Sequence, residues 1–216
     1  MCIRDRITTL RTGSTDDASE QVVEMLNSKV SPQSIYDALF LAGGELLMRQ
    51  PGIVALHALT STNAFHYAYR TATDDNTRRM ALLQNAAFLT MFREAMNNRG
   101  DVATKNIVEL AKTDGDTGVE HVFANVGKDN EAAAKHALAC LNKPGTADEL
   151  ISEARKFVFL KGTDSHDYKF SSAVLEDYYN ISPSWRDRYL AASVYKLRGA
   201  NGKDNGLVER IKTALA

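Results

Sequence analysis

Two side chains in the segment DSHDYKF combine a helical spacing with residue types that can bind metal or move protons. His166 and Lys169 lie three residues apart, and Asp164 precedes them as the expected helix N-cap, so both side chains lie on one helix face. We expect the positive end of the helix dipole, together with burial, to favour the neutral amine of Lys169. A neutral lysine is a base, a nucleophile or, after adding carbon dioxide, a carboxylate-like metal ligand. The alternative is that Lys169 extends into solvent and His166 is a surface residue.

His57 lies in VALHALTSTNA, a segment that is apolar or small on nearly every side. Ile53, Thr60 and Ala64 share its helix face, which predicts a buried imidazole beside a hydroxyl group. His66 is nine residues further on and faces the other side of the same helix. We expect His66 to be a hydrogen-bonded core residue, and the same interpretation stays open for His57.

The remaining histidines give weaker signals. His121 follows Glu120 beside an apolar stripe, which predicts a surface or boundary position. His136 follows Lys135 in a short amphipathic segment, which predicts an exposed position. Metal binding needs three or four ligands from different helices, an arrangement that helical bundles provide. We therefore expect His57, His166 and Lys169 to line one polar pocket inside the helical core. His121 is a fourth candidate ligand.

The segments that must position these residues are helices. Ser31 and Pro32 start the first, which Pro51 ends, and the apolar segment 53–72 should be a central, buried helix. No segment shows sustained strand alternation. The sequence therefore predicts an all-α fold, a multi-helix array of antiparallel helical hairpins. The expected helices cover residues 35–50, 53–72, 76–96, 104–113, 118–126, 131–142, 147–162, 164–180, 184–199 and 206–216.

The chain of 216 residues is long enough for one domain with a buried core. We expect a single helical domain over 8–216, divided into layers 8–99 and 104–216 near the Asn-, Gly- and Asp-rich stretch 98–117. Residues 1–7 resemble translated sequencing-adaptor read-through. The expectation is therefore that an N-terminal part of the same chain is missing, which leaves the localisation open.

Composition excludes several function classes. Lys and Arg number 26 against 27 Asp and Glu, so no basic footprint points to nucleic acid or to an acidic membrane. No apolar run approaches the ~20 residues that span a bilayer. The motifs of dinucleotide binding, phosphate loops, serine hydrolases and zinc proteases are absent. The expected partner is therefore a small-molecule substrate, with neither nucleic acid nor a membrane span.

The segments around these histidines resemble a known family. HALTSTNAFHYAYRT is similar to the His-x-x-Thr helix of questin-oxidase-like proteins, and DSHDYKF is similar to their Asp-x-His-x-x-Lys segment. Residues 33–216 also resemble a bacterial group of longer proteins, through HDYKFSSAVLEDYYNISPSWRDRYLAASV. The resemblance implies an all-helical oxygenase that opens or oxygenates polycyclic aromatic rings, with a non-haem iron held by histidines and a modified lysine.

The resemblance also assigns roles to residues. His57 matches the motif histidine, His166 and Lys169 match the later pair, and His121 is a looser candidate for the iron site. The family's earlier histidine motifs have no counterpart in this sequence. The alternative function is a non-catalytic helical binding or scaffold module. In that case the histidines are core hydrogen-bonding residues, and a groove between helices carries the function.

Overall fold

The computed structural model describes residues 3–114 and 118–216, which form helices and loops without any strand. The all-α prediction is confirmed. The helices of the first half are α1 (Ile3–Thr12), α2 (Thr15–Asn27), α3 (Pro32–Arg49), α4 (Ile53–Thr71) and α5 (Asp75–Met96). The second half contains α6 (Val119–Asn125), α7 (Asn130–Cys140), α8 (Thr146–Lys161), α9 (Ser165–Asn180), α10 (Pro183–Ser193) and α11 (Gly206–Leu215). Two short 3-10 helices, η1 (Asn97–Arg99) and η2 (Ile107–Glu109), lie between the halves.

Helix α3 is the most deeply buried of the described helices. Helix α4 packs against α3, α5 and α9, but the prediction that it would be buried on nearly every side is wrong. Every side chain of α3 from residue 35 to residue 48 is buried, whereas α4 exposes Ala64, Tyr67 and Ala68. Small and aromatic residues are tolerated at protein surfaces, so the apolar character of α4 did not require burial. The deep burial of α3 was hard to predict from the sequence, because the helix contains two carboxylates, Asp37 and Glu45.

Both buried carboxylates of α3 have partners from other elements. Glu45 accepts hydrogen bonds of 2.7 and 2.6 Å from the Arg11 guanidinium and one of 3.0 Å from the backbone N–H of Ile107. Asp37 accepts one of 3.0 Å from the backbone N–H of Ser182, just before α10. Buried charges are tolerated where hydrogen-bonding partners surround them, so these two carboxylates join α3 to α1, η2 and α10.

The helix expected over 104–113 is wrong, because only Ile107–Glu109 forms a short 3-10 turn. Apart from the hydrogen bonds within this turn, backbone groups of the segment bond to other elements. The N–H of Thr113 donates to the carbonyl of Lys135, and Arg188 donates to the carbonyl of Leu110 at 2.6 Å. These tertiary partners replace the hydrogen bonds that a helix would supply.

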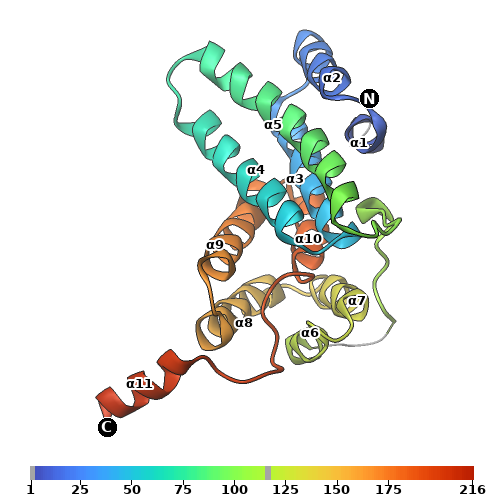
Figure 1. Ribbon diagram of the computed structural model, residues 1–216. Helices are drawn as coiled ribbons and strands as arrows, with labels where there is room; N and C mark the ends of the chain where they lie inside the picture. Colours follow the sequence, from blue (N-terminus) through green and yellow to red (C-terminus); the bar gives the residue numbers. More distant parts are fainter. Residues whose placement is uncertain (1–2, 115–117) are drawn as a thin grey trace.

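The chain returns to its first half near its end (Figure 1). Helix α9 packs along α4, and α10 packs on α3, while α6, α7 and α8 form the lower part of the molecule. Helix α11 stands apart from the body at the C-terminal end. Residues 98–114 lead from the upper part towards the lower part, and residues 115–117 lie outside those that the structure describes.

The N-terminal helix is part of the packed body. Ile7 belongs to the segment that we expected to lie outside the fold, yet it is fully buried in the core. Arg93 donates 2.9 and 2.7 Å hydrogen bonds to the carbonyl oxygens of Leu10 and Gly13, at the end of α1. These contacts fix α1 against α5. Residues 1 and 2 of the same segment lie outside the described part.

Candidate functional site

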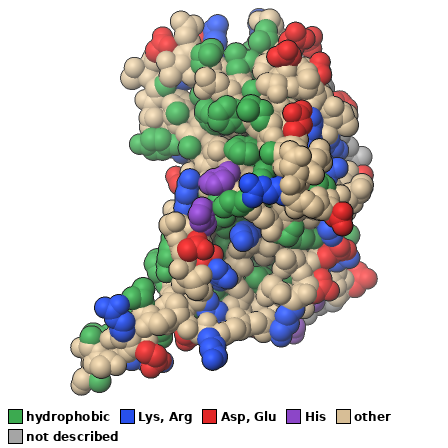
Figure 2. Space-filling model, in the orientation of Figure 1, with side chains coloured by type: hydrophobic (Ala, Val, Ile, Leu, Met, Phe, Trp, Pro, Cys, Tyr) green, Lys and Arg blue, Asp and Glu red, His purple; other side chains and the backbone are tan. Residues whose placement is uncertain are grey.

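The histidines of α4 and α9 meet where these two helices pack together. The ring centroids of His57 and His166 lie 5.8 Å apart, with an interplanar angle of 77°. Two histidine side chains lie against each other on the face shown in Figure 2, with lysine or arginine side chains beside them. The structure thus brings together two residues that are 109 positions apart in the sequence.

Lys169 lies one helical turn after His166 and acts electrostatically on His57. Partial burial lowers the pKa of His57 below its ordinary value, and the positive charges of Lys169 and His166 lower it further. His57 is therefore mainly neutral at pH 7. The neutral imidazole is the form that binds metal ions.

Asp164 contacts both the backbone and the ring of His166. It caps α9 by accepting a 2.7 Å hydrogen bond from the backbone N–H of His166, as the sequence predicted. Its Oδ1 atom also lies 3.3 Å from Nδ1 of the same histidine. A carboxylate at one ring nitrogen orients an imidazole and leaves the other nitrogen available as a ligand.

The site is open to solvent, so the prediction of a pocket inside the core is wrong. His57 is half-buried, Lys169 is exposed, and the His166 side chain is 46% exposed. The reason is that α9 is the element packed over this face of α4, and its first turn has water on its other side. The burial that we expected to favour a neutral Lys169 is therefore missing.

His121 lies on α6, where it pairs with a different histidine. Its ring centroid is 6.1 Å from that of His136 on α7, and its Nδ1 atom lies 3.3 Å from a carboxylate oxygen of Glu120. His136 is half-buried rather than exposed, because the two helices pack their histidines against each other. The four candidate ligands thus divide into a cluster of three on α4 and α9 and a separate residue on α6.

Further along the α4–α9 interface lies a buried polar network that the sequence analysis missed. Asp177 is fully buried and accepts hydrogen bonds of 2.7 Å from Asn63 on α4 and 2.9 Å from the hydroxyl of Tyr189 on α10. Burial raises the pKa of Asp177 to about 7, although both hydrogen bonds oppose this shift. The available signal was a carboxylate on the same helix face as Phe170 and Val174.

His66 is buried, as the sequence predicted, among aromatic side chains of α3. Its ring meets those of Tyr36 and Phe40 edge-on, at centroid distances of 4.7 and 5.3 Å. Burial lowers the pKa of His66 to about 4, so the ring is neutral at pH 7. Its position on the opposite side of α4 separates it from His57.

The residues of the cluster fit a metal ion only if Lys169 contributes an oxygen ligand. Imidazoles that ligate one metal through bonds of ~2.1 Å have ring centroids roughly 4.5–6.5 Å apart, which includes the spacing of His57 and His166. No group of three His, Cys, Asp or Glu residues suited to a metal ion occurs in the described part of the chain. A carbamate on Lys169 would complete a set of two histidines and one carboxylate, which is typical of non-haem iron sites.

Comparisons with protein-family models, curated proteins and solved structures return no match to this chain. Among the described helices, none is both long enough and apolar enough to cross a membrane.

Proposed function

We propose that His57, His166 and Lys169 form part of the iron site of a questin-oxidase-like oxygenase that acts on polycyclic aromatic or related substrates. The observation that carries this proposal is the contact of the two histidine rings, 5.8 Å apart, with Lys169 one turn along α9. These are the residues that the resemblance assigns to the site, and helices far apart in the sequence bring them together.

Lys169 becomes a metal ligand when its amine is converted to a carbamate. The Lys169 ammonium first gives a proton to water. The free amine then attacks carbon dioxide: a nitrogen–carbon bond forms, the electron pair of one C=O π bond moves to oxygen, and an N–H proton leaves to water. The resulting carbamate is negatively charged and supplies a carboxylate-like oxygen. The exposure of Lys169 gives carbon dioxide and water access to the amine.

The chain's own residues prepare the site before any metal is present. Partial burial and the neighbouring positive charges keep His57 neutral, and Asp164 holds the ring of His166 in one orientation. Ferrous iron with open coordination positions supplies the activation of dioxygen when it is bound at such a site. The polycyclic substrate class rests on the family resemblance.

Replacement of Lys169 by Met tests the proposal, because the change keeps the bulk of the side chain and removes the amine. We expect wild-type protein loaded with ferrous iron and ¹³C-bicarbonate to retain metal and to give a carbamate ¹³C signal. Lys169→Met should lose the signal and most of the iron, with an unchanged circular dichroism spectrum.

The exposed Lys203 provides a matched control, since Lys203→Met should retain both the signal and the iron. His121→Ala should also retain the iron, because His121 lies with His136 and not with His57. Equal iron content in wild type and Lys169→Met would refute the proposed ligand role.

The second candidate function is a non-catalytic helical binding module. The observation in its favour is a groove of about 400 Å³ between α8 and α9, whose lining includes neither His166 nor Lys169. Binding of a partner through this groove with no iron bound at His57 would favour the module over the oxygenase.

A further inference from the structure

Helix α11 is an amphipathic arm that buries none of its side chains. Leu207, Ile211 and Leu215 are 51, 56 and 83% exposed, and their spacing of four residues places them on one helix face. Figure 1 shows the helix leading away from the rest of the molecule. An exposed apolar stripe of this length is unusual for a helix that has no partner.

The start of the arm is held firmly against the end of α8. The backbone N–H of Asn205 donates to the carbonyl of Leu160 at 2.7 Å. The side-chain amide of Asn205 donates to the carbonyls of Phe159 and Gly162, at 2.8 and 2.9 Å. These bonds satisfy the last carbonyls of α8 and fix the point from which α11 leaves the body.

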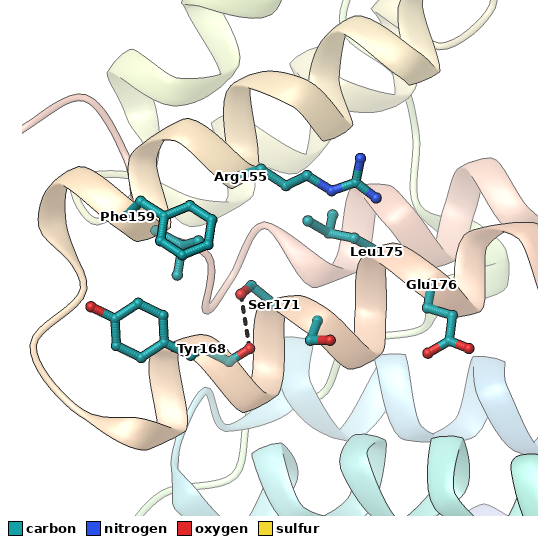
Figure 3. A pocket seen from close by; sticks show the side chains of 8 residues that line it. Arg155, Phe159, Tyr168, Ser171, Leu175 and Glu176 are labelled. Atoms are coloured by element: carbon teal, nitrogen blue, oxygen red, sulfur yellow. Dashed lines mark hydrogen bonds between the residues drawn. The ribbon is translucent and has the colours of Figure 1, made fainter.

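The α8–α9 groove begins at the same place. Its volume is about 400 Å³, and Phe159 and Tyr168 lie at one end, with ring centroids 6.0 Å apart (Figure 3). Phe159 is 67% exposed, which leaves a large aromatic surface in contact with water. Four other lining residues are small or apolar: Val158, Ser171, Ser172 and Leu175.

The groove and the apolar stripe match in length. From Leu207 to Leu215 the arm extends ~12 Å, at a rise of ~1.5 Å per residue. The α9 wall of the groove extends roughly 10 Å from Tyr168 to Leu175. Small serine side chains in this wall leave room for apolar side chains of a helix laid along it.

The charges beside the two surfaces are also complementary. Arg155 and Glu176 lie at the end of the groove away from the aromatic residues (Figure 3). The apolar stripe of α11 has Arg210 on one flank and Lys212 on the other, with Glu209 behind it. Glu176 can therefore pair with Arg210 or Lys212 of an arm that lies in the groove.

We propose that α11 of one copy lies in the α8–α9 groove of a second copy, and that the exchange is reciprocal. The arm leaves the body away from its own groove, so the occupant comes from another chain. Because the arm starts beside the groove, a twofold axis near Asn205 places the arm of each copy in the groove of the other. This arrangement closes the assembly as a dimer. Each copy covers the exposed stripe and the exposed Phe159 of the other.

The oligomeric state tests this proposal directly. We expect sedimentation equilibrium of the full chain to give a dimer, and Ile211→Asp to give a monomer with an unchanged helical spectrum. Val23→Asp is the matched control, since Val23 is an exposed apolar residue on α2, and it should leave the dimer intact. A monomeric wild type at all concentrations, or a dimer that survives Ile211→Asp, overturns the proposal.

Disulfide trapping tests the location of the arm. In a background carrying Cys2→Ser, we expect a mixture of Ile211→Cys and Ser172→Cys proteins to form a mixed disulfide dimer on oxidation. The native Cys140 is buried and does not compete. Ser172→Cys alone should remain monomeric on a non-reducing gel. A dimer that dissociates with Ile211→Asp but gives no mixed disulfide places α11 on another surface and refutes the groove as its site.

Discussion

The interface between α4 and α9 holds polar groups at two levels, and burial is what separates them. Near the start of both helices, His57 and His166 meet beside solvent. Further along, Asn63, Asp177 and Tyr189 are joined by hydrogen bonds where water has little or no access. One pair of helices thus carries an open cluster and a closed network.

This difference in burial gives the two groups of polar residues different roles: the buried network stabilises the fold, and the exposed cluster is available to bind a ligand. In the closed network each donor needs its acceptor, because a buried group without one costs about 1–3 kcal/mol. This requirement fixes the alignment of α4, α9 and α10. In the open cluster water can satisfy the imidazoles, so the rings stay free to accept a ligand. The network should therefore control stability, and the cluster should control binding.

The largest expected effect is the pH dependence that Asp177 confers. The pKa of Asp177 is about 7 in the folded chain and 3.8 ordinarily. Between these pH values the unfolded chain loses the proton and the folded chain keeps it. The stability that Asp177 contributes is therefore fully present below pH 3.8 and is lost as the pH rises through 7. Asp177→Asn removes this loss. The variant should gain about 3 kcal/mol over wild type between pH 4.5 and pH 8, measured by urea unfolding.

The exposed Asp101 supplies the control for this experiment, because Asp101→Asn should follow the wild-type pH profile. A difference between Asp177→Asn and wild type that does not change with pH would mean that Asp177 is ionised normally in the folded protein.

Tyr189→Phe should have the next largest effect. The change keeps the ring in the core and removes the hydroxyl that donates to Asp177 at 2.9 Å. Hydrogen bonds to charged groups contribute about 1.5–3 kcal/mol, so we expect a loss near 2 kcal/mol in urea unfolding at pH 8. The loss should be smaller at pH 4.5, where the carboxyl is protonated. Equal losses at both pH values would contradict the charge-assisted bond.

The smallest expected effect on stability comes from the open cluster. His57→Ala and His166→Ala should each cost less than about 1 kcal/mol in urea unfolding, because one ring is half-buried and the other exposed. If either variant lost as much as Tyr189→Phe, the histidine pair would be a structural contact, and the distinction between the two levels would fail.

The sequence predicted helix positions well where the helix boundaries carry local signals. Ser31 and Pro32 begin α3, and Asp164 caps α9, as the sequence predicted. These signals act through neighbouring backbone groups, so they operate in any tertiary context. The conformation of the segment 104–113 could not be predicted in this way, because several of its backbone groups bond to α3, α7 and α10.

For the candidate site too, the sequence predicted what depends on neighbouring residues, whereas what depends on helix packing came from the structure. The three-residue spacing placed His166 and Lys169 on one face of α9, and Asp164 was identified as the cap. The contact of His57 with His166 was an expectation that only the packing of α4 on α9 could test. Burial was misjudged for His57 and His136, because exposure depends on which elements cover a face.

The sequence by itself determined the all-α class and most helix boundaries, since caps, prolines and helical spacing act over a few residues. The tertiary structure decided which helix is most deeply buried, which histidines meet and which carboxylates are buried. Those outcomes depend on contacts between residues far apart in the chain, such as Arg11 with Glu45 and Asn63 with Asp177. A buried carboxylate and an exposed one look alike in sequence, because the partners that make burial possible come from other helices.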